Sequence, residues 1–480
     1  MDNLQNIAAL LAVVFYWLFS AAVTIRVITR RRPVSGTLAW LMVIYVIPLI
    51  GAVLYLMIGE LNLGRRHAKR TRAMIDPYLH TISHRFGGSE AALPGGPLAQ
   101  GIHQLLIARN GVSALGYSAM QLLDTPEAIF EQWLRDIEQA TDSIRIETYI
   151  WHPGGRVDDI TEALIAASHR GVKVSLLIDH AGSRRFFRSH WRKKMVTAGI
   201  QVVPALPVKL MRALAQRIDL RLHRKLLIFD DRIAYTGSMN MADPVSFKRG
   251  AGVGQWIDIM LRLDGQAAPG LSKVFAWDWE VETSQRELPE YYPADTQWAN
   301  WVSVIPSGPG VGEDLIGQAV LSVIYRANKS ITICTPYFVP SEAIFEALCQ
   351  AAKRGVDVNV LLPKHNDSMM VGWASRSYFE LLLESGAKIH RFDGGLLHSK
   401  VMLIDEEVAL VGSVNLDIRS LQLNFELTIA LFDGDSSTRI GRLLNSYLRQ
   451  SEMLTLPCWR ERSRGARVLE RSMFFMSPLL

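Results

Sequence analysis

Two long apolar runs stand at the start of the chain, ahead of any alternating pattern. Residues 7–25 carry no charged side chain, and residues 38–58 again carry none. Each run has about the 20 residues that a helix needs to cross the hydrocarbon core of a bilayer. We therefore predict a membrane anchor over residues 1–72, with two transmembrane helices at about 7–25 and 38–58. A cleaved signal peptide is the alternative for the first run, although that run lacks a basic N-terminal flank.

The remainder of the chain repeats one pattern of strands and helices. The β-rich run SIRIETYIW (143–151) matches SITICTPYF (330–338), and TAGIQV (197–202) matches ESGAKI (384–389). Between them, ALIAASHRGVKVSLLID (163–179) matches ALCQAAKRGVDVNVLLP (347–363). In this last pair alanine and leucine recur at helical spacing, a glycine ends the helix, and a fully apolar strand follows. The order strand, helix, strand, helix, strand, hairpin predicts an α/β unit with a mixed sheet, present twice.

The repeat sets the expected domain organisation. A chain of 480 residues is long for a single core. We expect a linker over residues 73–110, a first α/β domain over 111–285 and a second over 286–480. The proline-containing stretch RELPEYYPADTQW (286–298) is the expected bridge between the copies. Two independent domains that share no site are the alternative interpretation of such a repeat.

Positive charge is concentrated near the N-terminus. Of the 52 basic and 46 acidic residues, nine and two lie in residues 1–72, so the rest of the chain holds 43 and 44. The net charge of +6 therefore comes from clusters beside the apolar runs, where anionic lipid headgroups attract basic residues. A nearly neutral body argues against a nucleic-acid partner, because such binding depends on basic surface. Three cysteines without paired spacing fit a reducing compartment and exclude a cysteine-based zinc cluster.

Each copy ends in a hairpin that carries polar residues on otherwise apolar strands. Residues i and i+2 of a strand point to the same face. Folding the second hairpin about Glu406 places residues 398–400 opposite roughly 412–414, and the first hairpin folds about Asp231 in the same way. A histidine, an ammonium, a hydroxyl and an amide aimed at one point form a receptacle for a phosphate group. The two predicted sets are His223, Lys225, Ser238 and Asn240, and His398, Lys400, Ser413 and Asn415.

An aspartate completes the spacing H-x-K-x-x-x-x-D in each hairpin. Asp230 and Asp405 have the opposite strand parity to the histidines and fall at the turn. We therefore interpret them as residues that hold the turn and do not touch a substrate. One such motif is weak evidence, whereas two, each followed by G-S-x-N inside a repeat, are strong. Surface hairpins with solvated polar faces are the alternative.

On these motifs the chain resembles the phospholipase D superfamily with two HKD motifs, and within it the bacterial cardiolipin synthases. The resemblance extends to the apolar N-terminal runs and to CTPYFVPSEA (334–343), SRSYFELLLESGAKIHRF (375–392) and GSVNLDIRSLQLNFEL (412–427). It implies two tandem phospholipase D-like α/β sandwich domains with mixed sheets behind two transmembrane helices. It also implies one active site at a pseudo-two-fold axis, where one histidine attacks phosphorus and the other protonates the leaving alcohol. His223 is favoured as the nucleophile on family grounds, with His398 as the acid and base.

The resemblance further implies a carboxylate downstream that holds each catalytic histidine. Glu426 follows His398 at a suitable position, and Asp258 follows His223 at a longer spacing. A carboxylate on imidazole Nδ1 fixes the tautomer and leaves Nε2 free to attack. A structural ion pair is the alternative role for Asp258. We expect no metal and no cofactor, since lysine and asparagine can balance the charge of the pentavalent phosphorus.

The implied reaction is phosphatidyl transfer between two phosphatidylglycerol molecules, which gives cardiolipin and glycerol. The alternatives are a membrane phospholipase D or another phosphatidyltransferase that uses phosphatidylethanolamine or water, a phosphodiester nuclease, and a non-catalytic membrane scaffold. We expect phosphatidylglycerol and anionic membrane lipids as partners, and a multi-pass protein of the bacterial inner membrane with its catalytic domains on the cytoplasmic side. Basic amphipathic segments that either contact lipid or are solvated faces lie at 183–194, 207–221 and 460–480. Tyr149 and Tyr337 either line the lipid path or belong to the core.

Overall fold

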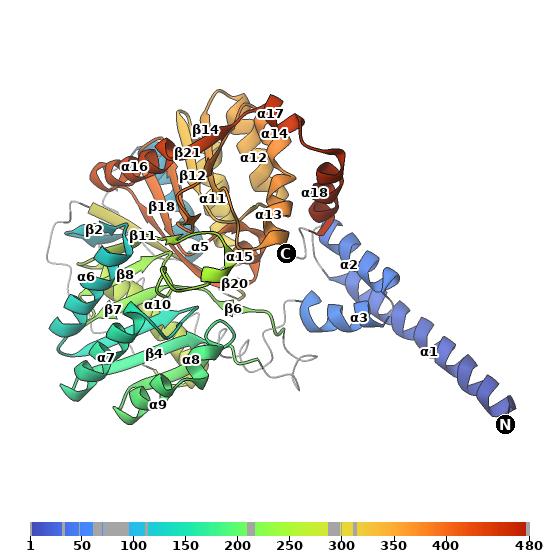
Figure 1. Cartoon of the computed structure of the whole chain (residues 1–480), viewed down its shortest axis with the longest axis horizontal. Coiled ribbons are helices and arrows are strands. Elements are labelled where there is room, and N and C mark those ends of the chain that lie inside the picture. Colours follow the sequence, from blue (N-terminus) through green and yellow to red (C-terminus); the bar gives the residue numbers. More distant parts are fainter. Residues whose placement is uncertain are drawn as a thin grey trace.

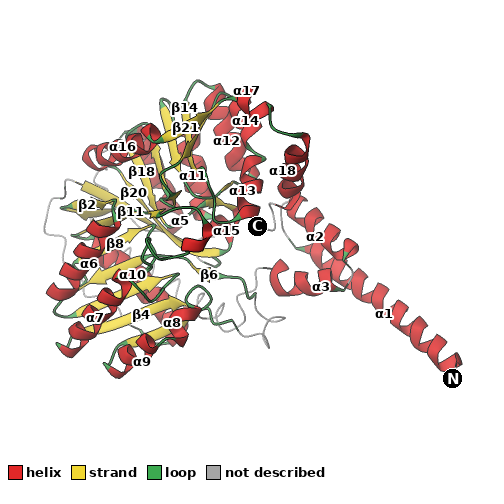
Figure 2. Cartoon of the chain, in the orientation of Figure 1, coloured by secondary structure: helices red, strands yellow, loops and turns green. Residues whose placement is uncertain are grey.

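The computed structural model describes residues 2–30, 34–47, 49–60, 70, 96–110, 114–208, 217–286, 298, 300–310 and 314–476. Figure 1 shows a long N-terminal helix extending away from a body that contains both copies of the repeat. In the body, strands from the two copies lie near its centre and helices flank them (Figure 2).

The N-terminal anchor differs from the sequence prediction in its second half. Helix α1 (Asp2–Thr29) contains the apolar stretch Gln5–Thr29, and among the described residues it is the one helix long and apolar enough to cross a membrane. The second predicted span is instead divided into α2 (Val34–Val46), α3 (Ile50–Leu54) and the π-helical η1 (Tyr55–Gly59). The interruption coincides with Pro48 in the sequence, which cannot donate a helical hydrogen bond. The prediction of two spanning helices is therefore supported for the first span alone.

Polar contacts tie α1 to the shorter helices. The Arg26 guanidinium donates to the Glu60 carboxylate at 2.6 Å, and the Tyr55 hydroxyl donates to the same carboxylate at 3.1 Å. Glu60 is buried, so this charge-assisted pair offsets the cost of removing the carboxylate from water. The anchor is thereby held together as one helical unit that begins with α1 and ends at Glu60.

The two copies of the repeat build sheets with the same strand order. The seven-stranded sheet runs β2-β10-β8-β7-β3-β4-β5, and the corresponding part of the second sheet runs β11-β20-β18-β17-β12-β14-β15. In both, the three strands that correspond to β3, β4 and β5 are parallel and the remaining pairs are antiparallel, as the predicted mixed sheet requires. The strands of the first sheet are β2 (Met120–Leu123), β3 (Ser143–Thr148), β4 (Lys173–Asp179), β5 (Gln201–Ala205), β7 (Leu226–Phe229), β8 (Ile233–Gly237) and β10 (Met260–Leu263). Those of the second are β11 (Asn300–Ser307), β12 (Ser330–Cys334), β14 (Asp357–Pro363), β15 (Lys388–Phe392), β17 (Val401–Ile404), β18 (Val408–Gly412), β20 (Asn424–Leu431) and β21 (Ser451–Leu454).

Apolar packing arranges these elements in layers. One core lies between the first sheet and its outer helices α6 (Pro126–Gln139), α7 (Arg156–His169) and α9 (His190–Thr197). A second lies between the other sheet and α11 (Leu315–Arg326) and α12 (Glu342–Lys353). The central core joins the two sheets through α10 (Ala267–Thr283) and α16 (Gly434–Arg449), each of which contacts both sheets. A buried surface of this extent makes the two copies one body, because apolar burial is the main stabilising contribution to folding.

Segments before the first copy belong structurally to the second. Residues 97–110, which the sequence assigned to the linker, form α5 (Pro97–Asn110) and pack into the core beside α11. Strand β1 (Leu115–Tyr117), assigned to the first domain, pairs with β11 of the second sheet. The predicted bridge lies outside the described residues except for its ends at 286 and 298.

The predicted lipid-contacting segments have different outcomes. In 183–194, which forms α8 (Arg184–Arg188) and α9, Phe186 and Trp191 are buried in the core and do not face outward. Most of segment 207–221, from 209 to 216, lies outside the described residues. The C-terminal segment forms α18 (Arg464–Met476), where Val468 and Phe474 are partly exposed. The remaining helices of the second copy are α13 (Met369–Arg376), α14 (Phe379–Glu384), α15 (Ile418–Gln422) and α17 (Leu456–Arg460).

Candidate active site

The two polar hairpins form with the predicted register. Leu226 pairs with Thr236 in the first and Val401 with Val411 in the second, which centres the hairpins on residues 231 and 406. Asp230 stands at the turn with a positive φ and accepts hydrogen bonds of 2.8–2.9 Å from the backbone N–H groups of residues 141–143. Asp405 does the same for residues 328–330 at 2.8 Å. Each aspartate therefore ties its hairpin turn to the loop before the neighbouring strand.

The backbone at each motif histidine is hydrogen-bonded to the other copy of the repeat. Strand β6 (Arg221–Leu222), just before the first histidine, pairs in parallel with β20 of the second copy. Strand β16 (Leu396–Leu397) pairs with β9 (Trp256–Ile257) of the first. The backbone N–H of His223 donates to the Phe425 carbonyl, and that of His398 donates to the Ile257 carbonyl, both at 2.8 Å. This exchange excludes two independent domains.

The carboxylates are paired across the copies, not within them as the sequence suggested. His223 Nδ1 is 2.8 Å from Glu426 Oε2, and His398 Nδ1 is 2.6 Å from Asp258 Oδ1. All four side chains are buried. Within-copy pairing of Glu426 with His398 was therefore wrong, and Asp258 contacts His398 instead of His223. The reason is the strand exchange, which carries each histidine toward the carboxylate-bearing strand of the other copy.

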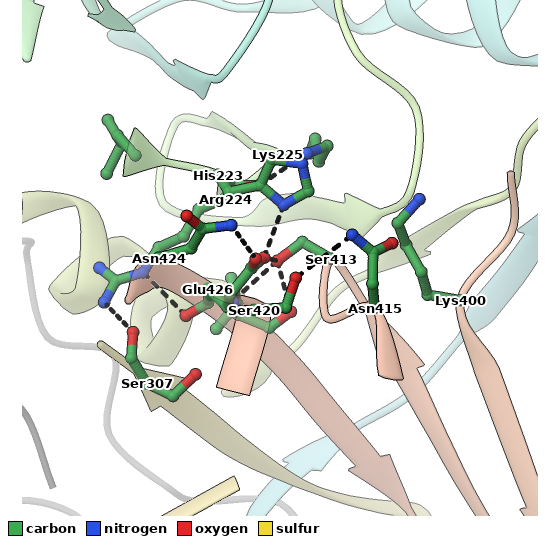
Figure 3. A network of polar contacts seen from close by, with 12 residues as sticks. His223, Arg224, Lys225, Ser307, Lys400, Ser413, Asn415, Ser420, Asn424 and Glu426 are labelled. Carbon is green, nitrogen blue, oxygen red and sulfur yellow. Dashed lines mark hydrogen bonds and ion pairs between the residues drawn. The ribbon is translucent and has the colours of Figure 1, made fainter. Parts of the chain in front are cut away.

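The two serines support these carboxylates. The Ser238 hydroxyl donates to Asp258 Oδ1 at 2.6 Å, and the Ser413 hydroxyl donates to Glu426. Their oxygens also accept the backbone N–H of Ile259 and Leu427 at 3.0 Å. Because each hydroxyl has a single proton, neither serine is left to donate to a phosphate, contrary to the sequence expectation. Figure 3 shows the hydrogen bonds that join the Glu426 carboxylate to the side chains of His223, Ser413 and Asn424.

Glycine in each G-S-x-N segment permits this close packing. A Cβ atom on Gly237 or Gly412 would collide with the carbonyl oxygen of Ile259 or Leu427 on the neighbouring strand. The neighbouring strands can therefore approach closely enough for the next residue, the serine, to reach the carboxylate.

The lysines and asparagines remain near the histidines. Lys225 Nζ donates to the carbonyl of His223 at 2.7 Å, and Lys400 Nζ to that of His398 at 2.6 Å. An ammonium ion has three N–H donors, so each of these two buried lysines has further donors to offer an anion. The side-chain oxygens of Asn240 and Asn415 are buried without a hydrogen-bond partner in the described part of the chain.

Burial controls the protonation of the site. It lowers the pKa of His223 and of His398 to about 4, against the opposing effects of Glu426 and Asp258. Burial alone would raise the pKa of Asp258, but His398, Lys400 and Ser238 lower it to about 2. Burial also lowers the pKa of Lys225 to about 7 and that of Lys400 to about 8. At neutral pH the free site thus holds two neutral imidazoles, two carboxylates and two lysines that are partly protonated.

These pKa values predict a low alkaline limit for activity. The lysines attract an anionic phosphodiester only as ammonium ions, so kcat/KM should fall as pH rises through about 7 to 8, well below the ordinary lysine value of 10.5. The acid side should remain active until pH approaches 4, where the neutral imidazole of His223, the favoured nucleophile, is lost. Lys225→Arg should move the alkaline limit upward, from about pH 7 toward the pKa of Lys400 at about 8, because a guanidinium stays protonated. An unchanged limit in Lys225→Arg, or a shift in the exposed control Lys193→Arg, would contradict this.

Both histidines line one cavity of about 610 Å³. Asn240, Asn415, Tyr149 and Tyr337 also line it, so both tyrosines belong to the cavity wall. The ring of Tyr149 lies 5.0 Å from that of His223. On the other side, the ring of Trp256 lies 4.5 Å from that of His398. The cavity is within the size range of sites for small ligands.

Sequence reasoning missed Arg224, which lies between the histidine and lysine of the first motif. Its guanidinium donates to the carbonyl of Glu426 at 3.0 Å and forms a buried ion pair with Asp278 of α10. Figure 3 shows its guanidinium to the left of Glu426, on the side away from Lys400. Ser399 occupies the corresponding place in the second motif. The sequence signal was this departure from symmetry, a bulky cation where the other copy has a small residue.

Comparisons with known proteins agree with this geometry. The profile of a family described as cardiolipin synthase, PLD-like domain, matches residues 133–252 and 320–448, and that of the phospholipase D-nuclease N-terminal segment matches residues 16–60. Cardiolipin synthase A of Cronobacter sakazakii and that of Shigella dysenteriae are each 44% identical over 491 residues, covering 100% of both chains. Phosphatidylserine synthase of Haemophilus influenzae superposes with a TM-score of 0.56 at 14% identity, over 79% of this chain and 98% of that one, a likeness in fold alone.

Proposed function

The chain belongs to the cardiolipin synthases of the phospholipase D type and is a phosphatidyltransferase, and we propose that it joins two phosphatidylglycerol molecules through a phosphohistidine. The single observation that carries this mechanism is the shared cavity, in which two imidazoles from different copies each present a carboxylate-held Nδ1. A carboxylate at Nδ1 keeps the proton there and leaves the Nε2 lone pair for the reaction.

In the first step, His223 Nε2 attacks the phosphorus of the donor lipid. A P–N bond forms, the P–O bond to the headgroup glycerol breaks, and His398 gives its Nε2 proton to the departing oxygen. His398 needs that proton although burial lowers its pKa to about 4 in the free site. The bound phosphodiester supplies a negative charge beside the ring, which raises the pKa and favours protonation. The lysine ammonium groups and the Asn240 and Asn415 amides balance the charge of the pentavalent phosphorus.

In the second step, a headgroup hydroxyl of another phosphatidylglycerol takes the place of the glycerol that left. His398 accepts the proton of this hydroxyl, the oxygen attacks phosphorus, and the P–N bond breaks. Cardiolipin is released, and both imidazoles return to their starting state. Each histidine therefore acts in both steps, one as nucleophile and leaving group, the other as acid and then base.

Product analysis tests this function. Purified protein in detergent micelles with phosphatidylglycerol labelled in its acyl chains should yield labelled cardiolipin and an equimolar amount of free glycerol. Phosphatidic acid as the main product would instead identify a phospholipase D that uses water. In a parallel reaction, phosphatidylethanolamine labelled in its acyl chains is added to unlabelled phosphatidylglycerol, and no labelled cardiolipin should form. Labelled cardiolipin in that reaction would identify a phosphatidyltransferase that uses phosphatidylethanolamine as donor.

We also propose that α1 crosses the inner membrane, that the shorter helices complete a multi-pass anchor, and that the body lies on the cytoplasmic side. Cys458 offers a natural probe, because it is exposed, while Cys349 is half-buried and Cys334 is buried. A membrane-impermeant maleimide should label Cys458 in lysed cells but not in intact spheroplasts. Cys458→Ser should remove that labelling. Labelling of Cys458 in intact spheroplasts would place the body on the other side.

A further inference from the structure

The proposed reaction brings two phosphates into one cavity. The donor phosphate reacts between the histidines, but the acceptor lipid carries its own phosphate, joined through the three carbons of glycerol to the attacking hydroxyl. This second phosphate is negatively charged throughout. A cavity that accepts it without repulsion needs positive charge beyond the charge that serves the reacting phosphorus.

One wall of the cavity has such charge. Arg184 and Arg185 of α8 and Arg221 of β6 line it, and we call these three residues the arginine group. None of them forms an ion pair with a carboxylate among the described residues. Arg184 also lacks any hydrogen-bond partner there, whereas Arg185 meets His152 Nε2 at 3.0 Å. Arg221 donates to the backbone carbonyls of residues 218 and 220 at 2.9 and 2.7 Å.

The other cations in the wall are already paired. Lys248 lies 2.9 Å from Asp367, and Arg419 lies 3.4 Å from Asp219. Asp179, on which the positive charge of Arg221 acts, is fully buried and accepts the backbone N–H groups of residues 182 and 222 at 2.7 and 3.0 Å. Burial raises the pKa of Asp179 to about 6, so at neutral pH it is mostly ionised, but its single negative charge leaves most of the charge of three guanidinium groups unopposed. Asp417 also lines the cavity, and the charge of Arg419 opposes the rise that burial causes in its pKa. Because Lys248 and Arg419 have carboxylate partners, the unbalanced positive charge of the cavity is concentrated in the arginine group.

The arginine group is one side chain away from the reacting centre. The centroid of the Tyr149 ring is 5.0 Å from that of the His223 ring, and the charge of Arg221 opposes the rise that burial causes in the pKa of Tyr149. Burial lowers the pKa of His180, and the charges of Arg184 and Arg221 lower it further, so both guanidinium groups act on the same ring. A phosphate bound by the arginine group would share the cavity with the phosphorus that reacts at His223, and the three carbons of the acceptor glycerol would join the two.

We propose that Arg184, Arg185 and Arg221 bind the phosphate of the acceptor phosphatidylglycerol, an inference that rests on the proposed function and extends it. Guanidinium groups suit this role because their forked donors match phosphate oxygens and remain charged at every relevant pH. The site selects an acceptor alcohol that carries a phosphomonoester or phosphodiester over a neutral alcohol or water. It leaves the chemistry at the histidines unchanged.

Two soluble acceptors test the proposal, because neither has to enter a membrane or micelle before it reaches the cavity. Labelled glycerol and labelled glycerol 3-phosphate are compared for incorporation into extractable lipid, with dilute phosphatidylglycerol in neutral detergent micelles as donor. The wild type should favour glycerol 3-phosphate. In Arg184→Gln and Arg221→Gln, incorporation of glycerol 3-phosphate should fall about 10-fold for each arginine, while incorporation of glycerol should stay the same.

Arg188→Gln is the matched control, since Arg188 is exposed on the same short helix but does not line the cavity. Arg221→Lys should recover part of the preference, because charge is kept while the forked geometry is lost. An equal fall for both acceptors would overturn the proposal and assign the arginines to donor or micelle binding. No change for either acceptor would overturn it as well. A wild type that makes no cardiolipin would refute the proposed function itself, a result distinct from either of these.

Discussion

His223→Ala and His398→Ala will each lower cardiolipin formation by about 10³-fold or more, because one change removes the nucleophile and the other removes the acid and base. The two variants should nevertheless differ with an activated donor. A phosphatidyl ester of p-nitrophenol needs no proton on its leaving group, so His398→Ala should release p-nitrophenolate once and accumulate a covalent phosphatidyl-protein. His223→Ala should do neither.

The measurement is the burst of p-nitrophenolate together with acid-labile label on the protein. His190→Ala serves as a control, because His190 is exposed on α9 and does not line the cavity. Thermal unfolding of each variant confirms that the fold is retained. A burst in His223→Ala and none in His398→Ala would reverse the assignment of the two roles. Substantial cardiolipin formation in either variant would refute the phosphohistidine mechanism.

Glu426→Gln and Asp258→Asn will each lower cardiolipin formation by about 10²-fold, within the range of general acid–base catalysis. An amide can donate a hydrogen bond to Nδ1, which moves the imidazole proton to Nε2 and blocks attack there. Because Glu426 contacts His223 and Asp258 contacts His398, the first substitution affects the nucleophile and the second affects the acid and base. Glu426→Gln should suppress the p-nitrophenolate burst, because its carboxylate holds the nucleophile. Asp258→Asn should retain the burst and lose activity with the natural donor.

Pairing within each copy predicts the opposite pattern, so the activated donor distinguishes the two arrangements directly. Asp264→Asn is a matched control, because this carboxylate accepts hydrogen bonds from residues 118 and 119 outside the cavity. Equal bursts in Glu426→Gln and Asp258→Asn would show that neither carboxylate orients the nucleophile.

The sequence predicted the parts of this structure that depend on local patterns. The matched runs at 143–151 and 330–338 became β3 and β12, and the hairpins closed about residues 231 and 406 as their spacing required. These features follow from strand periodicity and turn position, which a single segment contains. The aspartates of the motif also stand at the turns, as their parity indicated.

The features that the sequence did not predict depend on contacts between distant segments. Glu426 and Asp258 were recognised as carboxylates, but their partners were exchanged because β6 and β16 pair with strands some 200 or 140 residues away. The serines looked like phosphate donors until the position of those carboxylates was known. In the anchor, an apolar count over residues 38–58 overlooked the interruption between the helix that ends at Val46 and the helix that begins at Ile50.

The exchange of β6 and β16 bears on how such an enzyme can arise. A chain with one copy alone would expose an imidazole without its carboxylate, and it would complete a reaction centre only by pairing with a second identical chain. Covalent fusion of two such chains removes the need for symmetry. The halves are then free to diverge, as Arg224 and Ser399 have done, so that one imidazole can specialise in attack and its counterpart in proton transfer.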